Sequence, residues 1–281
     1  MGNSLDALLL KDKSTLISSN VSWKIFRINS SGEKETYLED PELVGIRDMM
    51  LSKDNKIYFV QDALYERIND STIITTRPKR AMSIDSLKNI NFEFELPDKK
   101  SSYSLLSVRA ENPLYAGNRS QLGGQLKIVE NSQKGKKQTG IDFFVSDFLE
   151  NRIYDVRKDS SMYSVDIFKE NLVAPPVAIK TDNQGNLYVL TSPLLNPDTT
   201  IVSQEPMILS IDSTRVATPI YSFSSENFDF SGPEYFEEGL SGRFSRLFSC
   251  SMNLFETDID VAFFITLSHN GKLLKLEATK P

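Results

Sequence analysis

Short apolar runs alternate with polar, turn-like stretches along most of the chain. One five-residue phrase recurs four times, with apolar side chains at its first three positions. The copies are YFVQD at 58–62, FFVSD at 143–147, YVLTS at 188–192 and FFITL at 263–267. Each copy follows a polar turn and leads through a loop to a second apolar run, which is typical of neighbouring strands in a repeated sheet. The pattern therefore predicts an all-β protein with the architecture of a β-propeller.

Strict alternation of apolar and polar side chains places the strands of the first repeats. Residues 23–28 and 33–38 flank a polar turn and predict a hairpin. The next four short apolar runs are interpreted as one whole blade, at 49–51, 57–60, 64–68 and 73–76. Residues 1–20 are interpreted as an N-terminal extension, and residues 21–281 as a single propeller domain.

The spacing of the phrase limits the number of blades. Successive copies begin 85, 45 and 75 residues apart. A four-stranded blade takes about 40–45 residues, so the spacing predicts five or six irregular blades. The N-terminal hairpin is expected to share a blade with the last predicted strand, at 272–276. Closure between the terminal strands would remove open sheet edges, on which proteins aggregate.

Composition excludes several classes of function. The 281 residues are 40% hydrophobic and 25% charged, as in an ordinary globular domain. A formal net charge of -6 argues against nucleic acid as a partner, because phosphate binding depends on clustered Lys and Arg. The one basic stretch, at 134–137, is interpreted as a solvated hairpin tip. No apolar run approaches the roughly 20 residues of a membrane-spanning helix.

Two residue types occur once each, which limits the available site chemistry. Cys250 alone excludes an intramolecular disulfide and a cysteine cage for a metal. His269 alone excludes a site with two histidine ligands, and its context predicts a surface turn. The first residues lack the basic head and long apolar run of a secretory leader. The chain is therefore expected to be cytoplasmic, or a mature secreted form from which a leader has been removed.

Two resemblances to known families follow from particular segments. Residues 143–147, followed by Glu-Asn-Arg-Ile at 150–153, resemble the NHL repeat, as do residues 182–189. A longer and more degenerate series is similar to the major royal jelly and yellow protein family, at 83–97, 143–165, 178–193 and 252–276. The second resemblance implies a secreted propeller that binds a small amphipathic ligand, such as a biogenic amine. The single Cys250 departs from that family, whose members carry several cysteines.

The candidate site follows from propeller geometry. Loops that leave the second strand of each blade gather at one end of a propeller, so residues just after the phrase are candidates for ligand binding. They are Asp62, Asp147, Thr191, Ser192, Thr266 and His269. A competing interpretation is that Asp62 and Asp147 cap turns within their own blades.

Two functions remain open for such a site. The favoured one is a non-catalytic binding module for a small molecule or protein partner at one face, with no cofactor and no metal. The alternative is a divalent-metal-dependent hydrolase, similar to gluconolactonase, with calcium held by carboxylates in the central channel. Such a site needs about three converging oxygen ligands, whereas Ser192 and Leu267 stand at the positions that match Asp62 and Asp147. This pattern favours the binding module.

Overall fold

The computed structural model describes most of the predicted strands. The described residues are 4–19, 23–69, 72–97, 126–131, 140–148, 150–191, 194–195, 202–204, 206–223, 251–257, 260–267 and 272–279. The basic tip at 134–137, Ser192, Cys250 and His269 lie outside them. Within these ranges, no helix has the length and apolar character needed to span a membrane.

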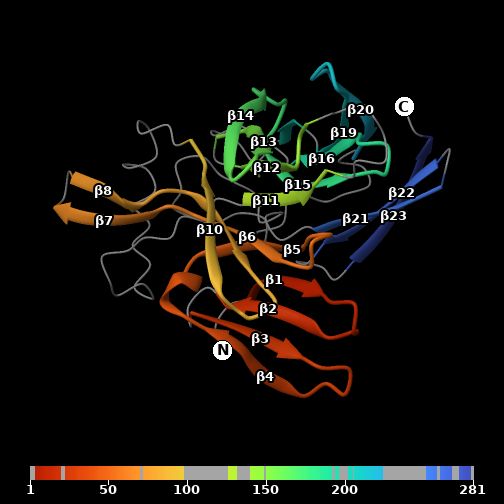
Figure 1. Ribbon diagram of the computed structural model, residues 1–281. Helices are drawn as coiled ribbons and strands as arrows, with labels where there is room; N and C mark the ends of the chain where they lie inside the picture. The colour runs from red at the N-terminus through yellow and green to blue at the C-terminus, as the bar shows by residue number, and fades with distance from the viewer. Residues whose placement is uncertain are drawn as a thin grey trace. The chain divides into compact units, whose positions relative to one another are not determined.

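The protein is an all-β propeller with five blades, each a sheet whose strands follow one another in chain order (Figure 1). Blade 1 contains β1 (Ser4–Leu9), β2 (Thr15–Ser19), β3 (Lys24–Ile28) and β4 (Lys34–Glu39). Blade 2 contains β5 (Ile46–Leu51), β6 (Ile57–Gln61), β9 (Arg80–Ile84) and β10 (Ile90–Glu95). Blade 3 contains β11 (Leu126–Glu130), β12 (Phe143–Asp147), β13 (Arg152–Asp159) and β14 (Met162–Glu170).

The remaining sheets complete the described structure. Blade 4 contains β15 (Pro176–Thr181), β16 (Leu187–Thr191), β19 (Met207–Ile211) and β20 (Ala217–Ser222). Blade 5 contains β21 (Ser251–Glu256), β22 (Asp260–Leu267) and β23 (Lys272–Thr279). Two hairpins stand apart from the blades, formed by β7 (Leu64–Asn69) with β8 (Thr72–Arg77), and by β17 (Leu194–Leu195) with β18 (Val202–Gln204). One short 3-10 turn, η1 (Pro41–Leu43), precedes β5.

The chain divides into two compact units. Unit 1 comprises residues 1–128 and 161–165, and unit 2 comprises residues 129–160 and 166–281. In unit 1, side chains from blades 1 and 2 form one apolar core, which includes Leu16, Ile25 and Phe59. Unit 2 has two such cores. One is shared by blades 3 and 4 and the other by blades 4 and 5. Each core results from the apolar faces of neighbouring sheets packing together, which is the arrangement that buries them from water.

Blade 2 differs from its prediction in the identity of its outer strands. Residues 64–68 and 73–76 are strands, as predicted, but they pair with each other as β7 and β8. The third strand of the blade is β9, which pairs with β6, and the fourth is β10. The interpretation of four successive runs as one blade was therefore wrong. Alternation along a strand shows which face is apolar, whereas the choice of partner strand depends on contacts that are remote in sequence.

Blade 1 also differs from its prediction. Residues 4–19, within the segment predicted as an extension, form β1 and β2. These strands pair with each other, and β2 pairs with β3. The predicted hairpin, now β3 and β4, is thus the second half of a complete N-terminal blade, and the described C-terminal strands form a sheet of their own. No blade in the described chain contains strands from both termini. The prediction that the termini share a blade missed β1 and β2 because neither alternates regularly: β1 ends in the apolar run Ala7-Leu8-Leu9, and β2 contains only two apolar residues, Leu16 and Ile17.

A five-residue turn recurs in the blades. The first N–H donates to the fifth C=O and the fourth N–H to the first C=O, in residues 10–14, 29–33, 52–56, 85–89, 182–186 and 212–216. Its fourth residue always has a positive φ, between 62° at Asn55 and 86° at Gly32. Four copies begin with Asn or Asp, whose side chain accepts further backbone N–H groups. The polar stretches before the phrases at 58–62 and 188–192 are therefore turns built by specific hydrogen bonds.

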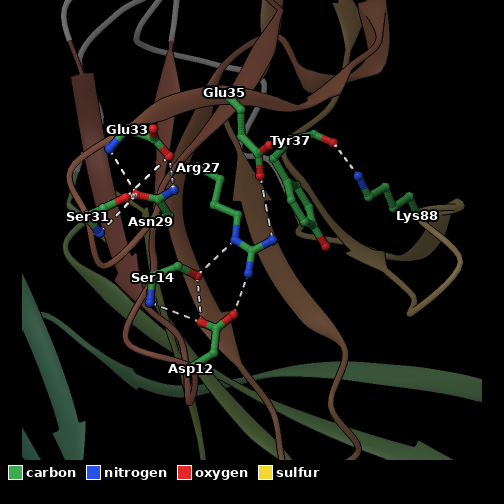
Figure 2. A network of polar contacts seen from close by, with 9 residues as sticks. All are labelled: Asp12, Ser14, Arg27, Asn29, Ser31, Glu33, Glu35, Tyr37 and Lys88. Carbon is green, nitrogen blue, oxygen red and sulfur yellow. Dashed lines mark hydrogen bonds and ion pairs between the residues drawn. The ribbon is translucent and has the colours of Figure 1, made fainter.

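Figure 2 shows this chemistry in blade 1. Asn29 Oδ1 accepts from the backbone N–H of Ser31 at 3.0 Å and of Glu33 at 2.9 Å. On the adjacent turn, Arg27 donates to Ser14 Oγ at 3.0 Å and forms an ion pair with Asp12. The hydrogen bonds of Ser14 to the Asp12 carboxylate are the main reason why the pKa of Asp12 is lowered. Side-chain hydrogen bonds thus stabilise both five-residue turns of this sheet, at 10–14 and 29–33.

Replacing Asp182 by alanine should reduce stability by about 2–3 kcal/mol, because it would leave buried donors without an acceptor. Asp182 is fully buried. Its Oδ1 accepts from the N–H groups of Gln184 and Asn186 at 2.9 Å, and its Oδ2 accepts from Tyr188 Oη at 3.1 Å. Asp212→Ala is the matched control, since the same turn is exposed there and should lose only about 1 kcal/mol. Urea unfolding followed by circular dichroism compares them, and equal losses would contradict the expectation.

Candidate functional site

The two ends of each blade differ in their connections. In blade 2, Ile46 at the start of β5 lies opposite Gln61 at the end of β6, so first strands begin where second strands finish. The five-residue turns lie at the other end. The connection after the second strand is long in blades 2 and 4, at 62–79 and 192–206, and carries the hairpins β7–β8 and β17–β18. We call the end where second strands finish the loop end of a blade.

Fourth strands also finish at the loop end. In blade 2, Glu95 of β10 lies opposite Arg80, and Arg80 lies opposite Gln61. In blade 4, Ser222 of β20 lies opposite Met207, whose backbone N–H donates a hydrogen bond to Thr191 Oγ1. The chain therefore leaves both blades at the loop end. The connections that follow, from β10 to β11 and from β20 to β21, are each about 30 residues long. Long connections on a rigid scaffold often carry binding residues.

Asp62 lies at the loop end of blade 2, as predicted, but its carboxylate is engaged by arginine. Arg47, at the start of β5, donates through Nε to Asp62 Oδ2, and both side chains are almost fully buried. Arg77 donates to the backbone carbonyls of Asp62 at 3.2 Å and of Val44 at 2.8 Å. The two arginines therefore fasten the base of the β7–β8 hairpin to the sheet.

Gln61 contributes a second part of this cluster. Its Nε2 donates to the carbonyl oxygens of Glu42 and Val44, at 2.5 and 2.9 Å, and its Oε1 accepts from Arg80 Nε at 2.8 Å. Arg80 also forms an ion pair with Glu42. Four basic side chains, Arg47, Arg77, Lys79 and Arg80, thus come to the loop end of one blade. We call them the basic cluster.

Asp147 ends β12 at the loop end of blade 3 and is fully buried. Its Oδ1 accepts from the backbone N–H of Glu150 at 3.1 Å, which is the bond of a turn cap. The Glu150 carboxylate in turn accepts from Arg152 at 3.2 Å and from Tyr154 Oη at 3.1 Å. This geometry matches the interpretation that Asp147 caps a turn in its own blade.

Thr191 ends β16 and joins the two sides of the β17–β18 insertion. Its Oγ1 accepts from the N–H of Met207 at 3.0 Å, and the hydroxyl is buried. Gln61 occupies the same place in the phrase, so the fourth position holds a polar side chain that bonds across the base of an inserted hairpin in both blades. Gln61 was not among the predicted site residues, although its position in the phrase was the signal. Thr266 lies in β22, with its backbone paired to Ser251, and Ser192 and His269 lie outside the described residues.

The described carboxylates do not fit a calcium site. Across the described ranges, no three His, Cys, Asp or Glu side chains lie close enough together to hold a metal ion. Calcium takes six to eight oxygen ligands, several of them carboxylates. Asp62 instead binds Arg47, and Asp147 binds a backbone N–H.

Tyr58, the first residue of the phrase in blade 2, predicts a pH effect on unit 1. Its hydroxyl lies 3.4 Å from that of Tyr163 and 3.5 Å from Asp54 Oδ2, and burial is the main reason why the pKa of Tyr58 is raised to about 12. The folded protein therefore keeps a proton that the unfolded chain releases at its usual pKa of 10.0. Stability should fall as the pH rises from about 10 to 12.

Urea midpoints measured by tryptophan fluorescence between these pH values test the effect. The only tryptophan, Trp23, belongs to unit 1. Tyr58→Phe should flatten the fall, and Tyr221→Phe, in unit 2, controls for the loss of one hydroxyl. An unchanged pH slope in Tyr58→Phe would contradict the expectation.

Comparison with known proteins shows similarity of fold. No protein-family model and no curated protein sequence matches the chain. A gluconolactonase of Xanthomonas campestris is similar in structure, with a TM-score of 0.55 and 10% identity over 98% of this chain and 71% of that one. A protein of unknown function from Bacteroides thetaiotaomicron gives 0.57 and 10%, over 99% and 60% of the two chains. A catalytically inactive virginiamycin B lyase of Staphylococcus aureus, in a structure with quinupristin, gives 0.50 and 15%, over 98% and 70%. At these identities the likeness establishes the propeller fold alone.

Proposed function

We propose that the chain is a non-catalytic propeller that binds a small molecule at the loop ends of its blades. The observation that carries this proposal is the difference between the two blade ends. Tight hydrogen-bonded turns close one end, whereas the inserted hairpins and the longest connections leave from the other. Connections of this length are uncommon in compact domains, and on a rigid scaffold they commonly carry binding residues.

The basic cluster gives the chemistry of the ligand. Arg77 and Arg80 are half-buried and lie beside the fully buried Gln61. Guanidinium groups recognise carboxylate and phosphate through paired hydrogen bonds, and burial strengthens this attraction. Arg47 and Arg80 already pair with Asp62 and Glu42, so an anionic ligand would take the place of the exposed Glu42 carboxylate on Arg80. The biogenic amine implied by the resemblance to yellow proteins has the opposite charge, so the cluster favours an anion over that ligand.

Thermal unfolding in the presence of defined probes tests this proposal. Citrate, gluconate and glucose 6-phosphate are the anionic probes, and dopamine is the amine probe. At least one anion at millimolar concentration should raise the Tm by a few degrees through preferential binding to the folded state. Arg80→Gln should abolish the shift, whereas Arg27→Gln, a matched change at the other end of a blade, should keep it. The absence of a shift with every anion, or a shift that survives in Arg80→Gln, would overturn the proposal.

A metal-dependent hydrolase is the second candidate. It is supported by the similarity in fold to the Xanthomonas campestris gluconolactonase. Hydrolysis of δ-gluconolactone, measured with calcium or zinc and again after chelation, distinguishes the two candidates. Under the binding proposal no metal-dependent turnover is expected. Turnover that is lost on chelation and in Asp147→Asn, in a protein that remains folded, would favour the hydrolase. The NHL and yellow-like relationships are further proposals, which an alignment of homologues would test.

A further inference from the structure

Blade 5 has an open edge within the part of the chain that the structure describes. Among the described residues it contains three strands, in the order β21-β22-β23, whereas blades 1 to 4 contain four each. The last strand, β23, is eight residues long and pairs along its whole length with β22. Its other side carries a row of backbone N–H and C=O groups that can accept a further strand. A long, regular edge of this kind is a natural site of strand pairing.

The side chains of β23 alternate strictly between the two faces of the sheet. Leu274, Leu276 and Ala278 pack against the core of blades 4 and 5 but are only partly buried. On the other face, Leu273 is 62% exposed. The Lys275 and Glu277 side chains are 56% and 68% exposed, with 2.5 Å between their charged groups. The apolar core is therefore only partly buried along β23, and an added strand would bury it further.

We propose that β23 pairs in antiparallel orientation with β23 of a second copy of this chain, across a two-fold axis at Leu276. In this register Leu276 faces Leu276 of the second copy, and Leu274 faces Ala278. Lys275 faces Glu277, and the symmetry repeats this pair on the other side of the axis. The sequence of the strand is thus complementary to itself, as a two-fold interface requires.

The two charges also select the register. Moving the axis by one residue to Lys275 sets two lysines opposite each other, and moving it to Glu277 sets two glutamates opposite each other. Like charges directly opposite in a sheet are unfavourable, and opposite charges are favourable. Lysine in an edge strand ordinarily discourages pairing. Only the register centred on Leu276 sets Glu277 of the second copy opposite Lys275, so the two charges disfavour the adjacent registers and favour this one.

Charge reversal tests this pairing directly. The wild-type chain should form dimers in a concentration-dependent manner, measured by size-exclusion chromatography with light scattering. Glu277→Lys places two lysines against two lysines, and Lys275→Glu places glutamates against glutamates, so each variant should be monomeric at concentrations where the wild type is dimeric. Mixed in equal amounts, the two variants should form dimers again, because every charge then meets its opposite.

Two controls make the result specific. Glu95→Lys makes the same charge change at an exposed position of β10, and it should leave the dimer intact. Unchanged circular dichroism in each variant excludes unfolding as the cause of a lost dimer. A monomeric wild type at the highest soluble concentration, single variants that still dimerise, or a mixture that stays monomeric would each overturn the proposal. This test does not depend on the proposed ligand, since β23 contributes no residue to the basic cluster.

Discussion

Replacing Arg47 by methionine should reduce the free energy of unfolding of unit 1 by about 3–5 kcal/mol, because the carboxylate of Asp62 would stay buried without this partner. The two side chains are 8% and 6% exposed, and Arg47 Nε donates directly to Asp62 Oδ2. Methionine keeps most of the volume of the arginine side chain, so the loss reports mainly on charge. Urea unfolding followed by the fluorescence of Trp23, which lies in the same unit, measures it.

The double variant Arg47→Met with Asp62→Leu separates charge from packing. Removing both ions together should recover most of the loss, since a buried ion pair often contributes little more than apolar side chains of similar size. Lys24→Met is the surface control. Its pair with Glu39, at 2.9 Å, is well exposed and should contribute less than about 1 kcal/mol. If Arg47→Met costs no more than Lys24→Met, Asp62 does not depend on this arginine, and the description of the loop end of blade 2 is wrong.

Replacing Phe144 by alanine should reduce the stability of unit 2 by about 3–5 kcal/mol through the cavity it leaves. Phe144 is completely buried in the core of blades 3 and 4. Its ring meets that of Phe168 edge to face, with 4.9 Å between the centroids. Edge-to-face contacts of this kind stabilise beyond the area they bury, so the lost pair adds to the lost burial. Circular dichroism in increasing urea measures the change.

Phe255→Ala is the control for the loss of an aromatic side chain in the same unit. Phe255 is 64% exposed, although its ring also packs edge to face against another, that of Phe264. Its removal leaves no cavity in the core and should reduce stability by about 1 kcal/mol or less. Similar losses in the two variants would mean that the second position of the phrase is not a core position in blade 3.

The strands and turns were largely predictable from local sequence. All four copies of the phrase fall on the second strand of a blade, in β6, β12, β16 and β22. The structure adds a fifth second strand, β2, whose turn at 10–14 has the same hydrogen bonds as those at 52–56 and 182–186. Alignment on these turns places Leu16 where Tyr58 and Tyr188 stand. Ser18 then stands at the third position, where the four copies of the phrase carry Val, Leu or Ile, which is why the pattern could not be recognised.

The partners of the candidate site residues were not predictable. Asp62 was identified from its position after a strand, yet Arg47 lies 15 residues before it and Arg77 lies 15 residues after it. Nothing in the local pattern joins these three residues. They meet because β5 lies antiparallel to β6 and because the β7–β8 hairpin returns the chain to the same end of the blade. Asp147 differs, since a cap bonded three residues ahead is a local contact that sequence context can suggest.

By itself, the sequence determined the β class, the repeated second strand and the polar turns, because each depends on side chains a few residues apart. Period-two alternation and turn residues act over that range. Only the tertiary structure decided which strands share a blade, that Asp62 binds arginine, and that no described strand pairs with the outer side of β23. These features depend on which distant segments come together to bury apolar surface and satisfy polar groups, and many pairings are compatible with the same local pattern.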